Sequence, residues 1–291
     1  MTAQLKTPLF KKIPMTRVRL GLARLLYFLF HTILRQDKQI IRRKGVFYEV
    51  DLTEGIDLSL YVFGNFQDNV TRNKYYSIPA DAVVIDVGAN IGSMTFKFAG
   101  MAPKGHVYAF EPTDYAYAKL FKNISLNPQF ASRITPVKRF LADQDRLKHE
   151  MKAYASWKVD GSIPNPHPLH GGAIKSADSV PAVTLDHFCL ENGIQRIDLI
   201  KIDTDGHEYK VLKGARKMIK KYRPYVVFEI GGYVLNEQQL EFKQFYDYFE
   251  NLGYRLLNAK NGKRITVRNF THQIPLRATT DIIAIPPKSI K

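Results

Sequence analysis

The sequence predicts an α/β fold in which helices cover both faces of a doubly wound, mostly parallel, Rossmann-like sheet. A short run of β-branched residues, Val83 to Ile85, ends at Asp86, as expected for a strand buried on both faces. A glycine-rich turn follows and leads into an apolar helix, and a second apolar strand, Val107 to Phe110, comes next. Strand, glycine turn, helix and strand together make one nucleotide-binding β-α-β unit.

The turn after the first strand has the features of a nucleotide site. Gly88 and Gly92 bracket Asn90, so the chain can turn sharply and a ligand can approach backbone that carries no Cβ. Ser93 is expected to cap the helix that follows. Glu111 comes about 20 residues after the glycines, where a carboxylate accepts hydrogen bonds from both ribose hydroxyls.

The order of residues in the turn indicates which cofactor binds. Dinucleotide folds usually show G-x-G-x-x-G, which points a helix N-terminus at a pyrophosphate, whereas this chain shows D-x-G-x-N-x-G. The carboxylate of Asp86 would repel a pyrophosphate and suits a ligand with ammonium and sulfonium centres. The pattern resembles class I S-adenosylmethionine-dependent methyltransferases. That resemblance implies S-adenosyl-L-methionine as cofactor, with Asp86 near its amino-acid part and Glu111 on its ribose.

A third strand is expected at Ile134 to Phe140, after a helix at Asp114 to Asn127. Leu141, Ala142 and Asp143 follow at its carboxyl end, where open parallel sheets bind ligands. We expect these three residues to help form the cofactor pocket. Asp143 either reaches the adenine amino group or lies in a solvated loop.

A second pair of strands is expected to bring carboxylates together. Ile197 to Ile202 ends at Asp203, and Tyr225 to Ile230 contains Glu229 near its end. Lys201 lies inside the first of these strands and needs an acidic partner, because an isolated buried charge is costly. If the two strands are neighbours, Asp203 and Glu229 converge at the carboxyl edge of the sheet. Such a pair is a candidate general base and equally a candidate site for a divalent metal, although no metal ligand is assigned.

Further motifs narrow the resemblance. VIDVGANIG, FEP, LFKNISLN, TLD, KIDTDGHE with VLKGA, and RPYVVFE as a set are similar to FkbM-type methyltransferases, a class I branch associated with O-methylation of sugars and related natural products. The resemblance covers roughly residues 60 to 286 and implies a seven-stranded sheet. By motif position it implies that Asp86, Gly88, Asn90, Gly92 and Glu111 hold the cofactor, and that Asp203, His207, Glu208 and Glu229 face the transferred methyl group. Where the family usually has Glu, this chain has Asp205, which keeps the charge with a shorter reach.

Methyl transfer from a sulfonium is an in-line displacement, so most of the catalysis should come from positioning the acceptor oxygen. A base that takes the hydroxyl proton contributes about 10²–10⁴-fold. Asp203 is the expected base and His207 the alternative, although the helix start disfavours an imidazolium at that position.

Three segments are expected along the chain of 291 residues: a basic amphipathic extension at 1–45, a β lead-in at 46–80 and a methyltransferase domain at 81–291. The lead-in is predicted as an antiparallel pair, Val46 to Leu52 with Ile56 to Phe63. The segment 151–180 lacks regular patterning and contains Trp157, His167 and His170. We expect it to be a loop or lid on the substrate side.

The net charge of +16 is concentrated at the N-terminus, where residues 1–45 hold eleven Lys or Arg residues and one acidic residue, Asp37. Nucleic-acid enzymes more often spread basic residues around a groove, so no nucleic-acid partner is expected. Residues 16–36 have the spacing of an amphipathic helix whose apolar run is too short to span a bilayer. This helix either lies on a membrane surface or packs on the catalytic domain or a second subunit. The single cysteine, Cys189, fits a reducing compartment, and we expect a cytoplasmic protein, peripheral on the inner face of a membrane if the helix binds lipid.

The expected partner is a small-molecule, glycan or lipid-linked acceptor. The sequence does not identify this acceptor or the oligomeric state. Three other functions stay open at this point: an NAD-dependent oxidoreductase, an RNA or DNA methyltransferase, and a non-catalytic membrane-associated scaffold that kept the fold.

Overall fold

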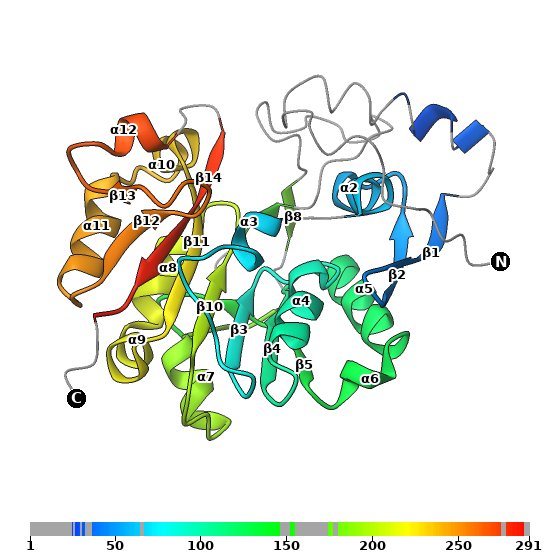
Figure 1. The fold of residues 1–291 in the computed structure, drawn as a ribbon, viewed down its shortest axis with the longest axis horizontal. Helices are drawn as coiled ribbons and strands as arrows, with labels where there is room; N and C mark the ends of the chain where they lie inside the picture. Colours follow the sequence, from blue (N-terminus) through cyan, green and yellow to red (C-terminus); the bar gives the residue numbers. More distant parts are fainter. Residues whose placement is uncertain are drawn as a thin grey trace.

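The computed structural model describes residues 25, 27–29, 31–32, 37–64, 67–145, 152–154, 174–176, 180–274 and 278–287. Its main sheet contains β3 (Val83–Val87), β4 (His106–Phe110), β5 (Ile134–Val137), β10 (Leu199–Ile202), β11 (Tyr225–Gly231), β12 (Arg255–Asn258), β13 (Arg264–Ile265) and β14 (Thr279–Ile285). The order across the sheet is β13-β12-β14-β11-β10-β3-β4-β5 (Figure 1). The predicted doubly wound α/β fold is confirmed, and the two-residue strand β13 adds an eighth member to the seven strands expected.

The sheet changes direction of winding between β3 and β10. From β3 the chain proceeds outward to β4 and β5, and it later returns to place β10 and β11 on the other side of β3, all in parallel register. The strand β14 is antiparallel to β11. Open α/β sheets bind ligands beyond the carboxyl ends of the strands at such a switch point. The loops after β3 and β10 are therefore where the site is expected.

Helices cover both faces of this sheet (Figure 1). They are α4 (Ser93–Met101), α5 (Asp114–Ser125), α6 (Pro128–Ala131), α7 (Leu185–Glu191), α8 (Glu208–Gly214), α9 (Arg216–Tyr222), α10 (Gly232–Glu237), α11 (Phe242–Glu250) and α12 (Phe270–Gln273). Successive strand residues point to opposite faces, and both faces of β3 are buried. Ile85 belongs to the apolar core that includes Phe249 of α11, and Val84 to the core that includes Phe96 of α4. Burial of each such side chain contributes about 1.5–3 kcal/mol.

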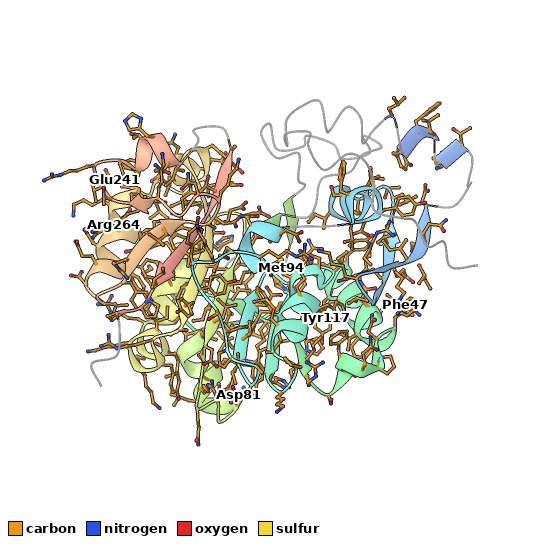
Figure 2. The ribbon with its side chains drawn as sticks, viewed as in Figure 1. Phe47, Asp81, Met94, Tyr117, Glu241 and Arg264 are labelled. Atoms are coloured by element: carbon orange, nitrogen blue, oxygen red, sulfur yellow. The ribbon has the colours of Figure 1, made fainter. Side chains whose placement is uncertain are left out.

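Side chains fill the space between the sheet and its helices (Figure 2). Met94 of α4, which is labelled there, is buried in the core on the β1–β2 side. Asp81 lies at the amino end of β3 and forms an ion pair with Arg196, with 2.8 Å between Oδ2 and Nη1. This end of the sheet is thus closed by polar contacts opposite the expected site.

The lead-in differs from its prediction. Residues 46–51 are a strand, β2 (Val46–Asp51), but its partner is β1 (Lys38–Arg43), which falls within the segment assigned to the N-terminal extension. The predicted second strand is a helix, α2 (Gly55–Phe63), and α3 (Asp68–Thr71) follows it. In a helix, Asp57 is buried against Lys119 of α5, a contact that an outward-facing strand position would not give.

Three local predictions also need correction. Gly92 is the N-cap of α4 and Ser93 its first helical residue, without a capping hydrogen bond from its side chain. The third strand ends at Val137, and a separate two-residue strand, β6 (Phe140–Leu141), pairs in parallel with β9 (Ala182–Val183). The segment 151–180 contains a short antiparallel pair, β7 (Lys152–Tyr154) with β8 (Ile174–Ser176).

Some predictions concern residues outside the described part of the chain. Trp157, His167 and His170 lie there, as does most of the predicted helix at 16–36. The described residues of that segment, 25, 27–29 and 31–32, are helical. A search of the described helices found none with the length and apolarity that crossing a membrane requires.

Candidate active site

The glycine turn after β3 packs directly against the end of β10. The backbone N–H groups of Gly88 and Ala89 both donate to the carbonyl oxygen of Phe110, at 3.0 and 2.9 Å. A Cβ at Gly88 would lie 1.8 Å from the carbonyl oxygen of Asp203, and the residue has φ +77°. Both facts require glycine at this position. The turn is therefore fixed between the strand ends of β4 and β10. Packing against Asp203 is what requires glycine at position 88, whereas the sequence had suggested the approach of a ligand to the backbone.

A hollow of about 540 Å³, part of it open to solvent, lies at the carboxyl ends of β3, β4 and β10. Its walls come from the glycine turn, the end of β4, the β6 segment and the loop after β10. They are Val87, Gly88, Asn90, Phe110, Glu111, Pro112, Thr113, Arg139, Phe140, Leu141, Asp203, Thr204 and Asp205.

Glu111 lies at the edge of this hollow, where the sequence placed it. Its carboxylate accepts hydrogen bonds from the backbone N–H of Asn90 at 3.0 Å and from the backbone N–H and Oγ1 of Thr113 at 3.0 and 2.6 Å. Burial raises its pKa, against the effect of these donors. The contacts fix the carboxyl group in one orientation, with acceptor capacity left for a ligand hydroxyl.

Asp86 does not line the hollow, which corrects the expectation that it touches the cofactor. The residue is fully buried, accepts a hydrogen bond from Thr95 Oγ1 at 2.6 Å and lies 3.6 Å from Lys201 Nζ. Lys201 Nζ also lies 3.3 Å from Asp203 Oδ2. The predicted partner of Lys201 is thus present, and Asp86 is a second one. Asp86 therefore supports the glycine turn indirectly, through its ion pair with Lys201.

The other predicted cofactor residues divide into two groups. Asn90, in the left-handed region at φ +49°, and Leu141 line the hollow. Gly92, Ala142 and Asp143 are not among the lining residues. Ala142 is buried, and Asp143 forms an ion pair with Lys213 at 2.5 Å, so its carboxylate faces α8 rather than a nucleobase.

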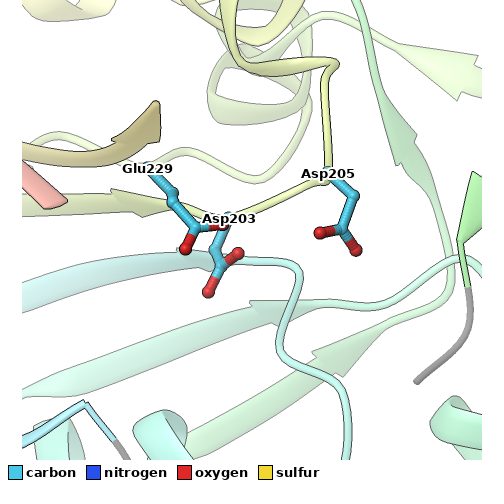
Figure 3. Close-up of side chains that lie close together, drawn as sticks. All are labelled: Asp203, Asp205 and Glu229. Carbon is cyan, nitrogen blue, oxygen red and sulfur yellow. The ribbon is translucent and has the colours of Figure 1, made fainter. Parts of the chain in front are cut away.

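Three carboxylates meet beside the hollow. One carboxylate oxygen from each of Asp203, Asp205 and Glu229 lies within 4.8 Å of the other two (Figure 3). Gln67 Nε2 donates to Asp203 Oδ2 at 2.7 Å. Burial alone would raise the pKa of Asp203, but Lys201 and the donor from Gln67 outweigh it and the pKa is lowered. Asp203 is therefore the ionised member of the group.

Its neighbours hold their protons more tightly. Burial, together with the negative charge of Asp203, raises the pKa of Glu229 well above its ordinary value, and Thr279 Oγ1 donates to its carboxyl group. Burial of its carboxyl group and the negative charges of Asp203 and Glu208 raise the pKa of Asp205 to about 8, although the residue as a whole is exposed at the wall of the hollow. One ionised carboxylate beside protonated ones is the arrangement that separates base and acid roles.

The sequence missed two residues of this group. Asp281 is the register partner of Glu229 across β11 and β14, and Asn69 Nδ2 donates to it at 2.5 Å. Burial and the nearby Asp203 raise its pKa to about 6. Gln67 is the other missed residue. Neither has a local motif, and an acidic residue early in the last strand was the only available signal for Asp281.

His207 and Glu208 do not face the hollow, contrary to expectation. The carboxylate of Glu208 is buried and accepts hydrogen bonds from the backbone N–H groups of Thr204 and Gly206, at 2.9 and 3.0 Å. It thereby shapes the loop that holds Asp205. The ring of His207 packs edge-on against Phe140 at 5.1 Å between centroids.

Similarity to known proteins identifies the family to which this site belongs. A family model described as the methyltransferase FkbM domain matches residues 86–256, more than half of the chain. This chain belongs to the FkbM methyltransferase family. The match begins at Asp86 and spans the glycine turn, Glu111 and the Asp203 loop, so the hollow lies within it. Membership implies S-adenosylmethionine as the methyl donor.

Two relatives of the family carry informative descriptions. The 2-O-methyltransferase NoeI of Sinorhizobium fredii is 29% identical over 57% of this chain and 70% of its own length. The hexuronic acid methyltransferase AglP of Haloferax volcanii is 22% identical over 56% of this chain and 62% of its own length. A solved FkbM methyltransferase from Methylobacillus flagellatus matches with a TM-score of 0.49 and 16% identity, over 78% of this chain and 52% of that one.

Proposed function

We propose that this FkbM methyltransferase transfers a methyl group from S-adenosylmethionine to a hydroxyl of a sugar, glycan or lipid-linked acceptor. The observation that carries the proposal is an ionised carboxylate, Asp203, at the wall of a hollow that the glycine turn and Glu111 also line. The names of NoeI and AglP support a sugar hydroxyl as the acceptor.

The residues of the hollow fit the proposed donor. When bound, S-adenosylmethionine supplies an electrophilic methyl group on a sulfonium. Glu111 has the position and fixed orientation to accept from ribose hydroxyls, and Gly88 and Asn90 of the glycine turn line the same hollow. The ionised carboxylate of Asp203 favours the sulfonium charge of the donor, a charge that S-adenosylhomocysteine lacks.

Asp203 is the proposed base. Lys201 and Gln67 fix the orientation of its carboxylate and keep it ionised. A fixed acceptor of this kind can take the proton of a hydroxyl as the new bond forms. Glu229 and Asp205, with raised pKa values, limit the negative charge that accumulates around Asp203.

The proposal is tested with Asp203→Asn in the full chain. Labelled methyl transfer from S-adenosylmethionine into glycan and lipid extracts should fall by about 10²–10⁴-fold, the contribution of a positioned base. Affinity for S-adenosylhomocysteine, measured by calorimetry, should change little. Asp143→Asn, whose carboxylate pairs with Lys213, is the matched control and should keep full transfer. Weak nucleoside binding with normal residual turnover in Asp203→Asn would refute the base assignment.

The same calorimetry separates the alternative functions. Binding of NAD in place of S-adenosylhomocysteine would favour an oxidoreductase, and binding without methyl transfer to any extract would favour a scaffold. Labelled transfer into RNA or DNA, and not into glycans or lipids, would replace the proposed acceptor class.

A further inference from the structure

A second hollow, separate from the one described above, lies between the lead-in and α4. Its walls come from the β1–β2 turn, the end of α2, the end of α3, the outer side of α4 and Phe130 of α6. Its volume is about 830 Å³, part of it open to solvent, and it shares no lining residue with the first hollow. Much of its wall comes from residues before 86, outside the match to the family.

Positive charge is in excess at this hollow. The lining residues Lys44, Arg72 and Lys97 all converge on one carboxylate, Asp68, at N···O distances of 3.4, 3.9 and 3.0 Å. Asp68 is one carboxylate shared by three cations, and none of the described residues that line the hollow is acidic. The side chains of Lys44 and Arg72 are 43% and 64% exposed, so they can turn toward a bound anion.

A fourth cation, Arg43, has a different role. Its guanidinium donates to the carbonyl oxygens of Leu60 and Tyr61, the last turn of α2. These bonds hold it at the wall and join the hairpin to α2, so Arg43 adds positive charge while it fixes the shape of the hollow.

The remaining wall is largely apolar. Met101 and Phe130 line the hollow and are partly exposed, and Val46, Leu60 and Phe96, which line it too, are buried. An apolar wall next to several cations suits a molecule with an anionic head and an apolar chain. Lys and Arg bind phosphate oxygens, and a concave apolar surface removes a hydrocarbon chain from water.

We propose that this hollow binds an anionic amphiphile, a phosphate headgroup that carries an acyl or isoprenoid chain. The phosphate would be held by Lys44, Arg72 and Lys97, and the chain would lie along Met101 and Phe130. The same segment of chain reaches the active site, because Gln67, between Gly64 and Asp68, donates to Asp203. The binding proposal does not depend on the methyl acceptor being correctly assigned.

Calorimetry with the full chain tests the proposal. The probes are geranyl phosphate and monomeric dihexanoyl phosphatidic acid, with inorganic phosphate and geraniol as the head and the chain alone. We expect each complete amphiphile to bind at least about ten-fold more tightly than either part. Equal affinity for inorganic phosphate or for geraniol would overturn the proposal. Tighter binding of geranyl phosphate identifies an isoprenoid-linked ligand, and tighter binding of the phosphatidic acid identifies a bilayer lipid.

Two substitutions with opposite expected signs locate the site. Lys97→Gln should weaken amphiphile binding by about ten-fold, since it removes a charged phosphate contact. Asp68→Asn should strengthen it, since it removes the carboxylate that competes for the three cations. Lys220→Gln, on the exposed side of α9, is the control and should leave binding unchanged. Each variant should retain its affinity for S-adenosylhomocysteine, which shows that it is folded. Weakening by Lys220→Gln equal to that by Lys97→Gln would refute a specific site.

Discussion

Lys201 connects the two halves of the active site at the level of single atoms. Its ammonium group is almost fully buried and lies near carboxylate oxygens of Asp86 and Asp203 and 3.4 Å from the carbonyl oxygen of Gly88. Burial alone would lower its pKa, but the two carboxylates outweigh burial and raise it. A charge buried without partners would cost several kcal/mol, so these residues stabilise one another. The glycine turn after β3 and the proposed base are thus held by one cation.

The sequence predicted part of this arrangement. A lysine in a core strand implied an acidic partner, either Asp203, because alternate strand residues share a face, or a carboxylate on the neighbouring strand. Asp203 is such a partner. The contact with Asp86 was missed, since it depends on the register between β3 and β10, which places Lys201 beside Asp86. Gln67 and Asp281 reach Asp203 and Glu229 from distant parts of the chain and left no local pattern.

Asp281 provides a prediction about stability and pH. Its pKa is near 3.8 in an unfolded chain and about 6 in the folded protein, so folding is penalised once the group must ionise. Stability contributed by the protonated form is fully present below pH 4 and is lost as the pH rises through about 6. An asparagine at position 281 cannot ionise, so Asp281→Asn avoids this loss. As the pH rises from 4 to 7, its free energy of unfolding should increase relative to that of the wild type by on the order of 3 kcal/mol. Urea unfolding of both proteins across this range measures the difference.

Asp143 serves as the control for Asp281, because its pKa is shifted in the opposite direction by folding. Burial opposes ionisation there, but Lys213 outweighs it and lowers the pKa of Asp143. Asp143→Asn should therefore lose stability relative to wild type as the pH rises through the low range where that carboxyl group ionises. A constant difference between Asp281→Asn and wild type from pH 4 to 7 would show that Asp281 is not ionised against a penalty.

At the scale of elements, the segment 55–63 shows where sequence patterning fails. Apolar residues at 56, 58, 60 and 62 alternate as in a strand, yet the segment also carries buried residues with helical spacing, at 57, 58, 61 and 62. A short apolar run satisfies both periods. The ion pair of Asp57 with Lys119 of α5 is a tertiary contact that only the helix supplies. The strands β3, β4, β10 and β11 were predicted correctly because their apolar runs are largely buried and end at acidic residues or glycines.

The turn after β3 offers a prediction at this scale. In Gly88→Ala the new Cβ would lie 1.8 Å from the carbonyl oxygen of Asp203, so the loops after β3 and β10 would have to separate. The positive φ of this residue adds backbone strain. We expect a loss of at least about 2 kcal/mol in the free energy of unfolding and at least ten-fold weaker binding of S-adenosylhomocysteine. Gly100→Ala in α4, where an added Cβ meets nothing within 4 Å, should instead be neutral or stabilise by up to about 1 kcal/mol. Normal nucleoside binding by Gly88→Ala would contradict the close packing of the two loops.

At the scale of the whole molecule, charge and apolar exposure gather toward the N-terminal part of the chain. Residues 1–45 carry most of the excess positive charge. Among the described residues of this part, Leu25, Phe28, Leu29 and Ile40 are exposed apolar side chains. Basic residues next to exposed apolar groups suit the surface of an anionic membrane. We propose that the chain binds such a surface through this part.

Phe28→Ser with Leu29→Ser tests this membrane proposal. The two side chains are 66% and 44% exposed, so the double variant should unfold like the wild type and bind S-adenosylhomocysteine equally well. Co-sedimentation with vesicles that contain phosphatidylglycerol should fall at least about five-fold, because both side chains would leave the apolar layer of the interface. Leu190→Ser, on an exposed position of α7 that is 69% accessible, is the control and should sediment like the wild type. Vesicle binding that survives the double substitution, or that is equally strong with uncharged phosphatidylcholine, would refute binding of an anionic membrane through these side chains.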